Sequence, residues 1–202
     1  MITAAIASGK GGTGKTTLAV NLSDYMAHEN RFRKVILADL DVEEPNSGIF
    51  IQGSADKTEI KYKMVPRWNK NKCTSCGRCH DLCRFNAIIT LASDVIIMPE
   101  LCHSCYACSE LCPEGALPMV PERIGELGFM ENGPLKFVEG RLDVGQEQAV
   151  PLIAQGIERI REELSGTRTA ETLFLIDSPP GTSCPVIEAA KNSDFVILVT
   201  EP

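Results

Sequence analysis

Residues 2–17 read ITAAIASGKGGTGKTT, an apolar run followed by a loop of glycines, lysines and threonines. Within this stretch, Gly9–Thr16 satisfies the phosphate-loop pattern G-x-x-x-x-G-K-[ST], between an expected strand at Ile2–Ser8 and an expected helix. Glycines allow backbone N–H groups to surround a phosphate, and the start of the helix adds the positive end of its dipole. The flanking strand and helix disfavour the alternative, a chance glycine turn, so we predict a nucleotide-phosphate site.

The loop supplies most of the predicted ligand contacts. Lys15 is expected to reach the β and γ phosphates of the nucleotide, and the Thr16 hydroxyl is expected to bind Mg²⁺. The helix after the loop carries Leu18, Leu22 and Met26 on one stripe, which predicts the side that packs on the sheet. The residues predicted to contact the nucleotide are Gly11, Gly12, Thr13, Gly14, Lys15, Thr16 and Thr17.

Aspartates follow two further apolar runs. Asp39-Leu40-Asp41 ends an expected strand at 35–38, and Asp177 ends another at 173–176. Ligands of α/β sheets bind at the carboxyl ends of strands, so Asp41 and Asp177 are predicted to belong to the site of the phosphate loop. An aspartate in this position also often caps a turn, and for Asp39 both interpretations stay open.

Eight of the nine cysteines fall in two runs with the spacing C-x2-C-x2-C-x3-C, and the second run repeats the first 29 residues later. This spacing is typical of bacterial ferredoxins, in which three cysteines of a run bind one [4Fe–4S] cluster and the fourth binds the other. The rule predicts one cluster on Cys73, Cys76, Cys79 and Cys112, and a second on Cys102, Cys105, Cys108 and Cys83.

Disulfides and zinc are the alternatives for these cysteines. The N-terminus lacks the basic region of a signal peptide, and a nucleotide loop belongs in a compartment where thiols stay reduced. Zinc sites usually pair two C-x2-C knuckles at a longer separation. One run ends in Cys112-Pro113 but the other in Cys83-Arg84, where the arginine is either a positive charge near a cluster or a solvated surface residue.

Composition excludes several functional classes. The formal net charge is −7 with no block of lysine or arginine, which gives no basis for binding nucleic acid. Apolar runs such as Phe195–Thr200 are too short to span a bilayer, and without an export signal we expect a cytoplasmic protein.

The expected fold is α/β: a mostly parallel, doubly wound phosphate-loop sheet with an inserted small α+β domain like a bacterial ferredoxin. We assign residues 1–62 and 121–202 to the sheet domain and 63–120 to the insert. A helix is predicted over 150–164 and another near Pro185, and 125–145 is expected to be irregular. Since no helix follows the last expected strand, we expect the C-terminal part of the domain to be missing; the alternative is a compact variant that ends there.

Lys10-Gly11-Gly12 resembles the deviant Walker motif of the MinD/ParA-type ATPases (the CobQ/CobB/MinD/ParA superfamily), which include the nitrogenase iron protein and Mrp-like cluster carriers. The resemblance implies that Lys10 reaches the nucleotide of a partner subunit in a nucleotide-dependent homodimer. It also implies that Asp41 orients or activates the attacking water. Asp39 would then act in the Mg²⁺ shell, and Asp177 would bind Mg²⁺ through water.

The overall plan resembles MinD-superfamily ATPases with an inserted ferredoxin domain. The resemblance implies an ATP hydrolase with Mg²⁺ and two [4Fe–4S] clusters, whose nucleotide switch controls electron transfer to a redox partner. An alternative is ATP-dependent assembly or delivery of clusters to an acceptor protein, as in Mrp-like relatives. A second alternative is a MinD-like positioning ATPase with structural clusters.

Other residues carry weaker signals. Cys184, seven residues after Asp177, resembles a cluster-bridging cysteine of the nitrogenase iron protein, but that family's second cysteine has no counterpart between 120 and 183. A small buried residue or a thiol at a helix start is the favoured interpretation. His80 and His103 are expected near cluster sulfur, and Trp68 at the seam between the domains.

Overall fold

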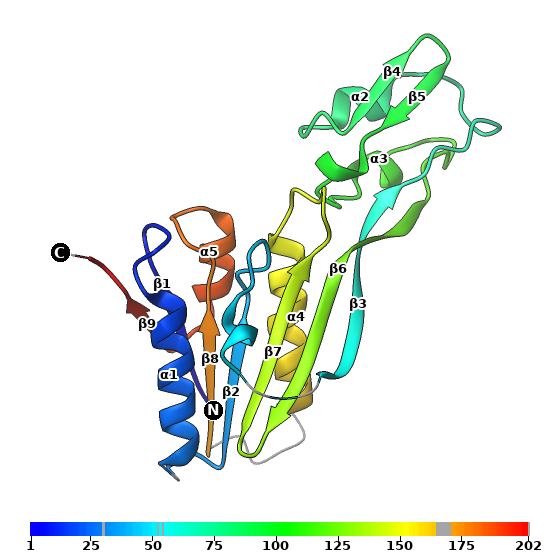
Figure 1. Ribbon diagram of the computed structural model, residues 1–202. Coiled ribbons are helices and arrows are strands. Elements are labelled where there is room, and N and C mark those ends of the chain that lie inside the picture. The colour runs from blue at the N-terminus through cyan, green and yellow to red at the C-terminus, as the bar shows by residue number, and fades with distance from the viewer. Residues whose placement is uncertain (30, 52, 54, 165–170, 202) are drawn as a thin grey trace. The chain divides into compact units, whose positions relative to one another are not determined.

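The computed structural model describes residues 1–29, 31–51, 53, 55–164 and 171–201 (Figure 1). The chain forms two compact units. We name the first the nucleotide unit; it consists of Met1–Lys61, Gly125–Asp143 and Ala149–Pro202. The second, the cysteine unit, consists of Tyr62–Ile124 and Val144–Gln148 and lies between stretches of the first along the chain.

A seven-stranded sheet is the centre of the nucleotide unit (Figure 1). β7, β2, β8, β1 and β9 are parallel, and β6 is antiparallel to β7, so the expected mostly parallel α/β sheet is confirmed. In sheet order the strands are β3 (Ala55–Pro66), β6 (Met119–Asn132), β7 (Leu135–Leu142), β2 (Lys34–Asp39), β8 (Thr172–Asp177), β1 (Ile2–Ala7) and β9 (Phe195–Leu198).

Helices cover both faces of this sheet. α1 (Lys15–His28) lies on one face, and α4 (Val150–Leu164) and α5 (Cys184–Ala190) lie next to each other on the opposite face. Side chains alternate along a strand, so Val35 and Leu37 of β2 pack on the α1 side while their neighbours face α4. The predictions for α4 and for a helix starting near Pro185 are confirmed. Within the described ranges, no helix is long and apolar enough to cross a membrane.

The packing side of α1 differs from the prediction. Leu18 is exposed, and Leu22 and Met26 are only partly buried, whereas Ala19 and Ser23 are fully buried. Small side chains on the inner side allow the helix backbone to approach the sheet closely, and the longer apolar residues pack at the edges of that contact.

The expectation of irregular structure over 125–145 is wrong, because most of this stretch forms the β6–β7 hairpin. Its glycines suggested a loop, yet two of them allow close packing instead. A Cβ on Gly125 would lie 2.3 Å from the carbonyl oxygen of Arg141, and one on Gly140 would lie 2.8 Å from Val42 Cγ1. A left-handed backbone is needed at Gly133, in the tight turn, with φ of 57°, and at Gly145, after β7, with φ of 88°.

The cysteine unit contains the hairpin β4 (Ile88–Leu91) and β5 (Asp94–Ile97), the short helices α2 (Arg78–Leu82) and α3 (Ala107–Glu110), and a 3-10 turn, η2 (Pro99–Leu101). Its backbone repeats every 29 residues. Left-handed residues at Ser75, Gly77 and Asn86 recur at Ser104, Tyr106 and Gly115.

Turn hydrogen bonds in the cysteine unit repeat at the same interval. The N–H of Cys83 donates to the carbonyl of His80, and that of Cys112 donates to the carbonyl of Ser109. The two repeats also exchange bonds, because Asn69 N–H donates to the Ala116 carbonyl and Met98 N–H donates to the Ala87 carbonyl. The duplication predicted from the cysteine spacing is therefore present in the backbone.

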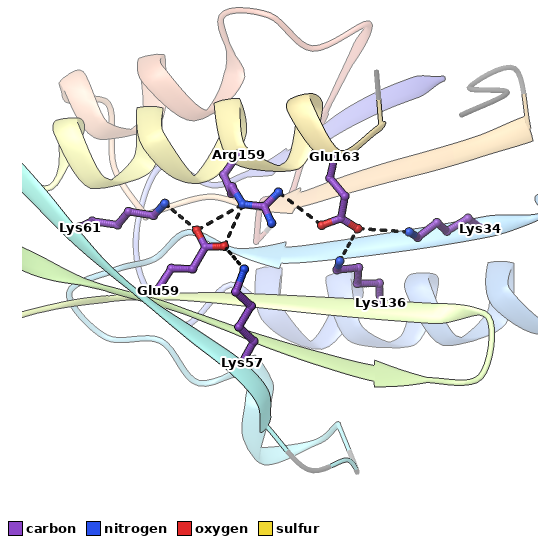
Figure 2. A network of polar contacts seen from close by, with 7 residues as sticks. All are labelled: Lys34, Lys57, Glu59, Lys61, Lys136, Arg159 and Glu163. Atoms are coloured by element: carbon purple, nitrogen blue, oxygen red, sulfur yellow. Dashed lines mark hydrogen bonds and ion pairs between the residues drawn. The ribbon is translucent and has the colours of Figure 1, made fainter. Parts of the chain in front are cut away.

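An ion-pair network ties the edge strand β3 to helix α4 (Figure 2). Glu59 accepts hydrogen bonds from Lys57 Nζ at 2.7 Å, from Lys61 Nζ at 2.8 Å and from Arg159 Nε at 2.9 Å. Burial acts to raise the pKa of Glu59, but these three cations outweigh it and lower the pKa to about 2. The network contains a second carboxylate, Glu163 of α4. It pairs with Arg159 and with lysines of β2 and β7.

We predict that Glu59 makes stability depend on pH. Its folded-state pKa is depressed, so its contribution is fully present above its ordinary value of 4.5 and is lost as the pH falls toward about 2. At pH 7, Glu59→Gln should lower the free energy of unfolding by roughly 2 kcal/mol in urea titrations, and the deficit should shrink between pH 5 and about pH 3. Glu158→Gln, on the exposed side of α4, is the control; a pH-independent deficit for Glu59→Gln would contradict the prediction.

Candidate functional site

The phosphate loop joins β1 to α1 at the carboxyl edge of the sheet. Gly12 and Gly14 have φ of 81° and 88°, a left-handed conformation that side chains other than glycine rarely adopt. The loop is fixed to its neighbours by the N–H of Gly181, which donates to the Ser8 carbonyl at 2.8 Å. One cavity is lined by all seven predicted nucleotide contacts and also by Ser8, Lys10, Asp41, Glu44, Asn46 and Pro180.

Lys15 and Asp41, which line this cavity, come together with the buried Asp177. The ammonium of Lys15 lies 2.7 Å from Oδ1 of Asp177 and 3.8 Å from Oδ2 of Asp41. Lys15 is 6% exposed and Asp177 is 0% exposed. Each charge depends on the other, because an unpaired ion this deeply buried is strongly unfavourable.

Asp39 is also buried, and its oxygens face backbone N–H groups. Oδ2 accepts hydrogen bonds from the N–H of Asn46 at 3.0 Å and of Ser47 at 2.8 Å, and Oδ1 accepts from the N–H of Asp41 at 3.1 Å. Burial raises the pKa of Asp39, against the effect of these donors. Asp39 thus fastens the segment after β2 to the end of the strand.

Ser47 connects this segment to Asp177. It begins the 3-10 turn η1 (Ser47–Ile49), is fully buried, and donates from Oγ to Oδ2 of Asp177 at 3.2 Å. Both carboxylate oxygens of Asp177 are therefore engaged, one by Lys15 and one by Ser47. Sequence reasoning missed Ser47, since Pro45-Asn46-Ser47-Gly48 signals only a turn.

Side-chain oxygens in the cavity are suited to binding the Mg²⁺ ion of a magnesium–nucleotide complex. Thr16 and Asp41 line the cavity, and hydroxyl and carboxylate oxygens are the ligands that Mg²⁺ prefers. Among the described residues, the Thr13 hydroxyl is buried with no hydrogen-bond partner, which leaves a donor for an anion in the loop. Lys10 lines the same cavity, but its ammonium pairs with Glu201 at 2.5 Å.

The eight cysteines of the cysteine unit line two cavities. The first is lined by Cys73, Cys76, Cys79 and Cys112, and the second by Cys83, Cys102 and Cys105; Cys108 lines both. Each cavity is thus lined by all four cysteines of one predicted set, and the first is lined by Cys108 of the other set as well. Over the described ranges, no three or more His, Cys, Asp or Glu side chains are arranged to hold a metal ion.

Polar hydrogens point toward sulfur around the first cavity, which suits an anionic group held by thiolates. Backbone N–H groups of Ser75 and Ala116 donate to the sulfurs of Cys73 and Cys112 at 3.4 and 3.3 Å. The indole nitrogen of Trp68 is buried beside the same cavity and, within the part of the chain that the structure describes, makes no hydrogen bond of ordinary geometry. Its N–H faces the sulfur of Cys73 and lowers the pKa of that thiol. Trp68 packs in the core of the cysteine unit.

Three other predicted residues have definite positions. His80 bonds through Nδ1 to the Ile88 carbonyl at 2.9 Å, and the ring of His103 stacks on Phe85 with 3.8 Å between centroids. His103 also lines the second cavity. Cys184 is exposed at the first residue of α5, as expected for a thiol at a helix start.

Residues 4–177 match the CobQ/CobB/MinD/ParA nucleotide-binding domain. The chain belongs to this family. The uncharacterized proteins MJ0578 and MJ0579 of Methanocaldococcus jannaschii are 31% and 28% identical to it. The matches cover 98% and 100% of the chain, and 67% and 70% of those proteins.

Among solved structures, the septum site-determining protein MinD of Pyrococcus horikoshii, complexed with Mg-ADP, matches at 19% identity with a TM-score of 0.48. The match covers the whole chain but only 58% of that protein. The predicted resemblance to MinD/ParA-type ATPases is confirmed for the nucleotide-binding domain by the family match.

The pKa of Asp41, at the edge of the cavity, is raised toward neutral pH. Burial raises its pKa, the Lys15 ammonium lowers it, and the carboxylates of Asp39 and Asp177 raise it again, to about 6. Its side chain is 17% exposed and lines the cavity, whereas Asp39 and Asp177 are fully buried below. Asp41 is thus the acid of this group placed to contact a ligand in the cavity directly.

We predict that the Ser47 hydroxyl stabilises the folded protein through its hydrogen bond to Asp177. Ser47→Ala leaves one oxygen of the buried Asp177 carboxylate without a donor, which should lower the free energy of unfolding by about 1–3 kcal/mol. Ser23→Ala is the matched control, because Ser23 is equally buried but donates only to the Val20 carbonyl within α1. Urea denaturation of both variants measures the difference, and equal losses would argue against the prediction.

Proposed function

We propose that this protein is an ATP hydrolase whose nucleotide switch is coupled to a two-cluster ferredoxin module for electron transfer. The observation that carries the proposal is the grouping of the cysteines. Within a nucleotide-binding domain of known family, two cavities are each lined by the cysteines that crossed [4Fe–4S] ligation requires.

Nucleotide binding is assigned to the phosphate loop and its partners. Gly11–Thr17 surround the phosphates, the Thr16 hydroxyl binds Mg²⁺, and Lys10 reaches the nucleotide of a second subunit in a homodimer. Lys15 exchanges the Asp177 carboxylate for the more highly charged β and γ phosphates, which frees Asp177 to bind a Mg²⁺-coordinated water. Asp41 orients the attacking water, and Asp39 acts beside the magnesium shell by fixing Asn46 and Ser47.

The exchange of partners by Lys15 is the proposed switch. Asp177 also accepts from Ser47, so a change at Asp177 reaches the segment that Asp39 holds. Along the chain this segment leads into β3 (Ala55–Pro66), which begins in the nucleotide unit and ends in the cysteine unit. A two-state arrangement of the segment is therefore placed to transmit nucleotide state.

The cysteine unit is assigned two clusters. Thiolates of Cys73, Cys76, Cys79 and Cys112 hold the first, and those of Cys102, Cys105, Cys108 and Cys83 hold the second. When bound, such clusters each store one electron, and the surrounding protein residues set the reduction potential of each cluster. The expected partner is a protein that accepts or donates electrons.

Cluster delivery to an acceptor protein is the second candidate. Each predicted set includes one exposed cysteine, Cys76 in the first and Cys105 in the second. An exposed ligand gives an incoming thiolate of an acceptor protein a route to the iron, which electron transfer alone does not need. The two candidates differ in whether iron leaves the protein.

An anaerobic experiment tests the proposal. Purified protein should contain iron and sulfide equivalent to two [4Fe–4S] clusters, and the ATP hydrolysis rate should differ between oxidised protein and protein reduced with dithionite. Iron transfer to an apo-ferredoxin is followed in parallel. Redox-independent hydrolysis with rapid iron transfer would favour delivery, and protein without iron would contradict both candidates.

We further predict separate roles for two acids that line the nucleotide cavity. Asp41→Asn should reduce the ATP hydrolysis rate by about 100-fold or more while ATP binding is retained, because the amide cannot accept a proton from water. Glu44→Gln is the control and should hydrolyse ATP at close to the wild-type rate. Equal losses in the two variants would show that the charge of the cavity, not the position of Asp41, sets the rate.

A further inference from the structure

The two cysteine cavities are built by equivalent backbone but are not chemically equivalent. The 29-residue repeat relates position 68 to position 97, and the hydrogen bonds of the neighbouring residues Asn69 and Met98 match across the repeat. The first position holds Trp68 and the second holds Ile97. One repeat therefore carries a side-chain N–H donor that the other lacks.

Trp68 is fixed against the first cavity. Its side chain lines that cavity together with Cys73, Cys76, Cys79 and Cys112, and packs in the cluster of buried residues that includes Ile88 and Leu117. The Lys70 ammonium lies 5.6 Å from the ring centroid, which further restricts the indole.

The buried indole N–H of Trp68 needs a hydrogen-bond acceptor. Its nitrogen is buried from solvent and makes no hydrogen bond of ordinary geometry, although buried polar groups nearly always do. The acceptor it faces is the sulfur of Cys73, and the indole N–H lowers the pKa of that thiol. An N–H group in this state is costly unless the cavity beside it holds an acceptor. The cysteines that line this cavity can supply such an acceptor, because a sulfur atom that carries negative charge accepts hydrogen bonds.

We propose that Trp68 donates a hydrogen bond from its indole nitrogen to a sulfur atom of the first [4Fe–4S] site. The inference rests on the proposed iron–sulfur function and assigns Trp68 a role that no spacing rule assigns. The bond joins those from Ser75 and Ala116 N–H groups, and Ile97 makes no equivalent contribution at the second site.

The consequence is a difference in reduction potential. Reduction adds one electron and makes the sulfurs more negative, so a hydrogen-bond donor stabilises the reduced state more than the oxidised state. Trp68 therefore raises the potential of the first site, and an electron entering the unit is retained there more strongly than it would be without the indole N–H.

The test is an anaerobic redox titration monitored by electron paramagnetic resonance. Trp68→Phe keeps an aromatic ring but removes the N–H, and should shift one of the two couples to lower potential. A tenfold change in the ratio of reduced to oxidised protein corresponds to about 59 mV for one electron. Ile97→Val is the matched control at the equivalent position and should shift neither couple.

A second measurement needs no substitution. Trp68 is the chain's only tryptophan, so growth on ¹⁵N-indole-labelled tryptophan labels this donor alone. Electron–nuclear double resonance of the reduced protein should show a ¹⁵N coupling to one cluster. Two intact clusters with unchanged potentials in Trp68→Phe and no ¹⁵N coupling would overturn the inference alone; a protein without iron and sulfide would overturn the proposed function with it.

Discussion

The buried ion pair between Lys15 and Asp177 is the interaction on which the nucleotide site depends. It joins the helix after the phosphate loop to the end of β8, and its acid is shared with Ser47, which Asp39 holds from β2. Three adjacent strands of the sheet thus meet through side chains at one point. Because neither ion is stable alone in so buried a position, any ligand that attracts Lys15 must rearrange the partners of Asp177.

In the proposed switch, a change in ligand charge has effects beyond the cavity because Asp177 also accepts a hydrogen bond from Ser47. Asp177 and Asp39 accept the hydrogen bonds that Ser47 donates from its hydroxyl and its N–H, so both carboxylates help to hold the turn at Ser47–Ile49. Farther along the chain, Glu59 and Arg159 hold β3 to α4 by an ion pair. The segment of the proposed switch and this ion pair therefore follow one another along the chain.

Much of the site could be predicted from sequence because its signals are local. The phosphate loop is one continuous pattern, and Asp41 and Asp177 directly follow apolar strands. The sets of cysteines are predicted from spacing alone, and each set lines one of two cavities, with Cys108 lining both. What sequence reasoning missed depends on contacts between distant residues: Ser47 acts through a carboxylate 130 positions away. Gly125 and Gly140 suggested a loop, because the close approach of a neighbouring backbone or side chain leaves no trace in the local pattern.

The exchange of hydrogen bonds between the two repeats of the cysteine unit has a consequence for how such a unit is built. Asn69 bonds to Ala116 and Met98 bonds to Ala87, so each half completes the backbone pairing of the other. Cys112 and Cys83 are exchanged between the cavities in the same way. Cutting the chain between the two halves would therefore leave each without the backbone partner and the exchanged cysteine that the other half supplies.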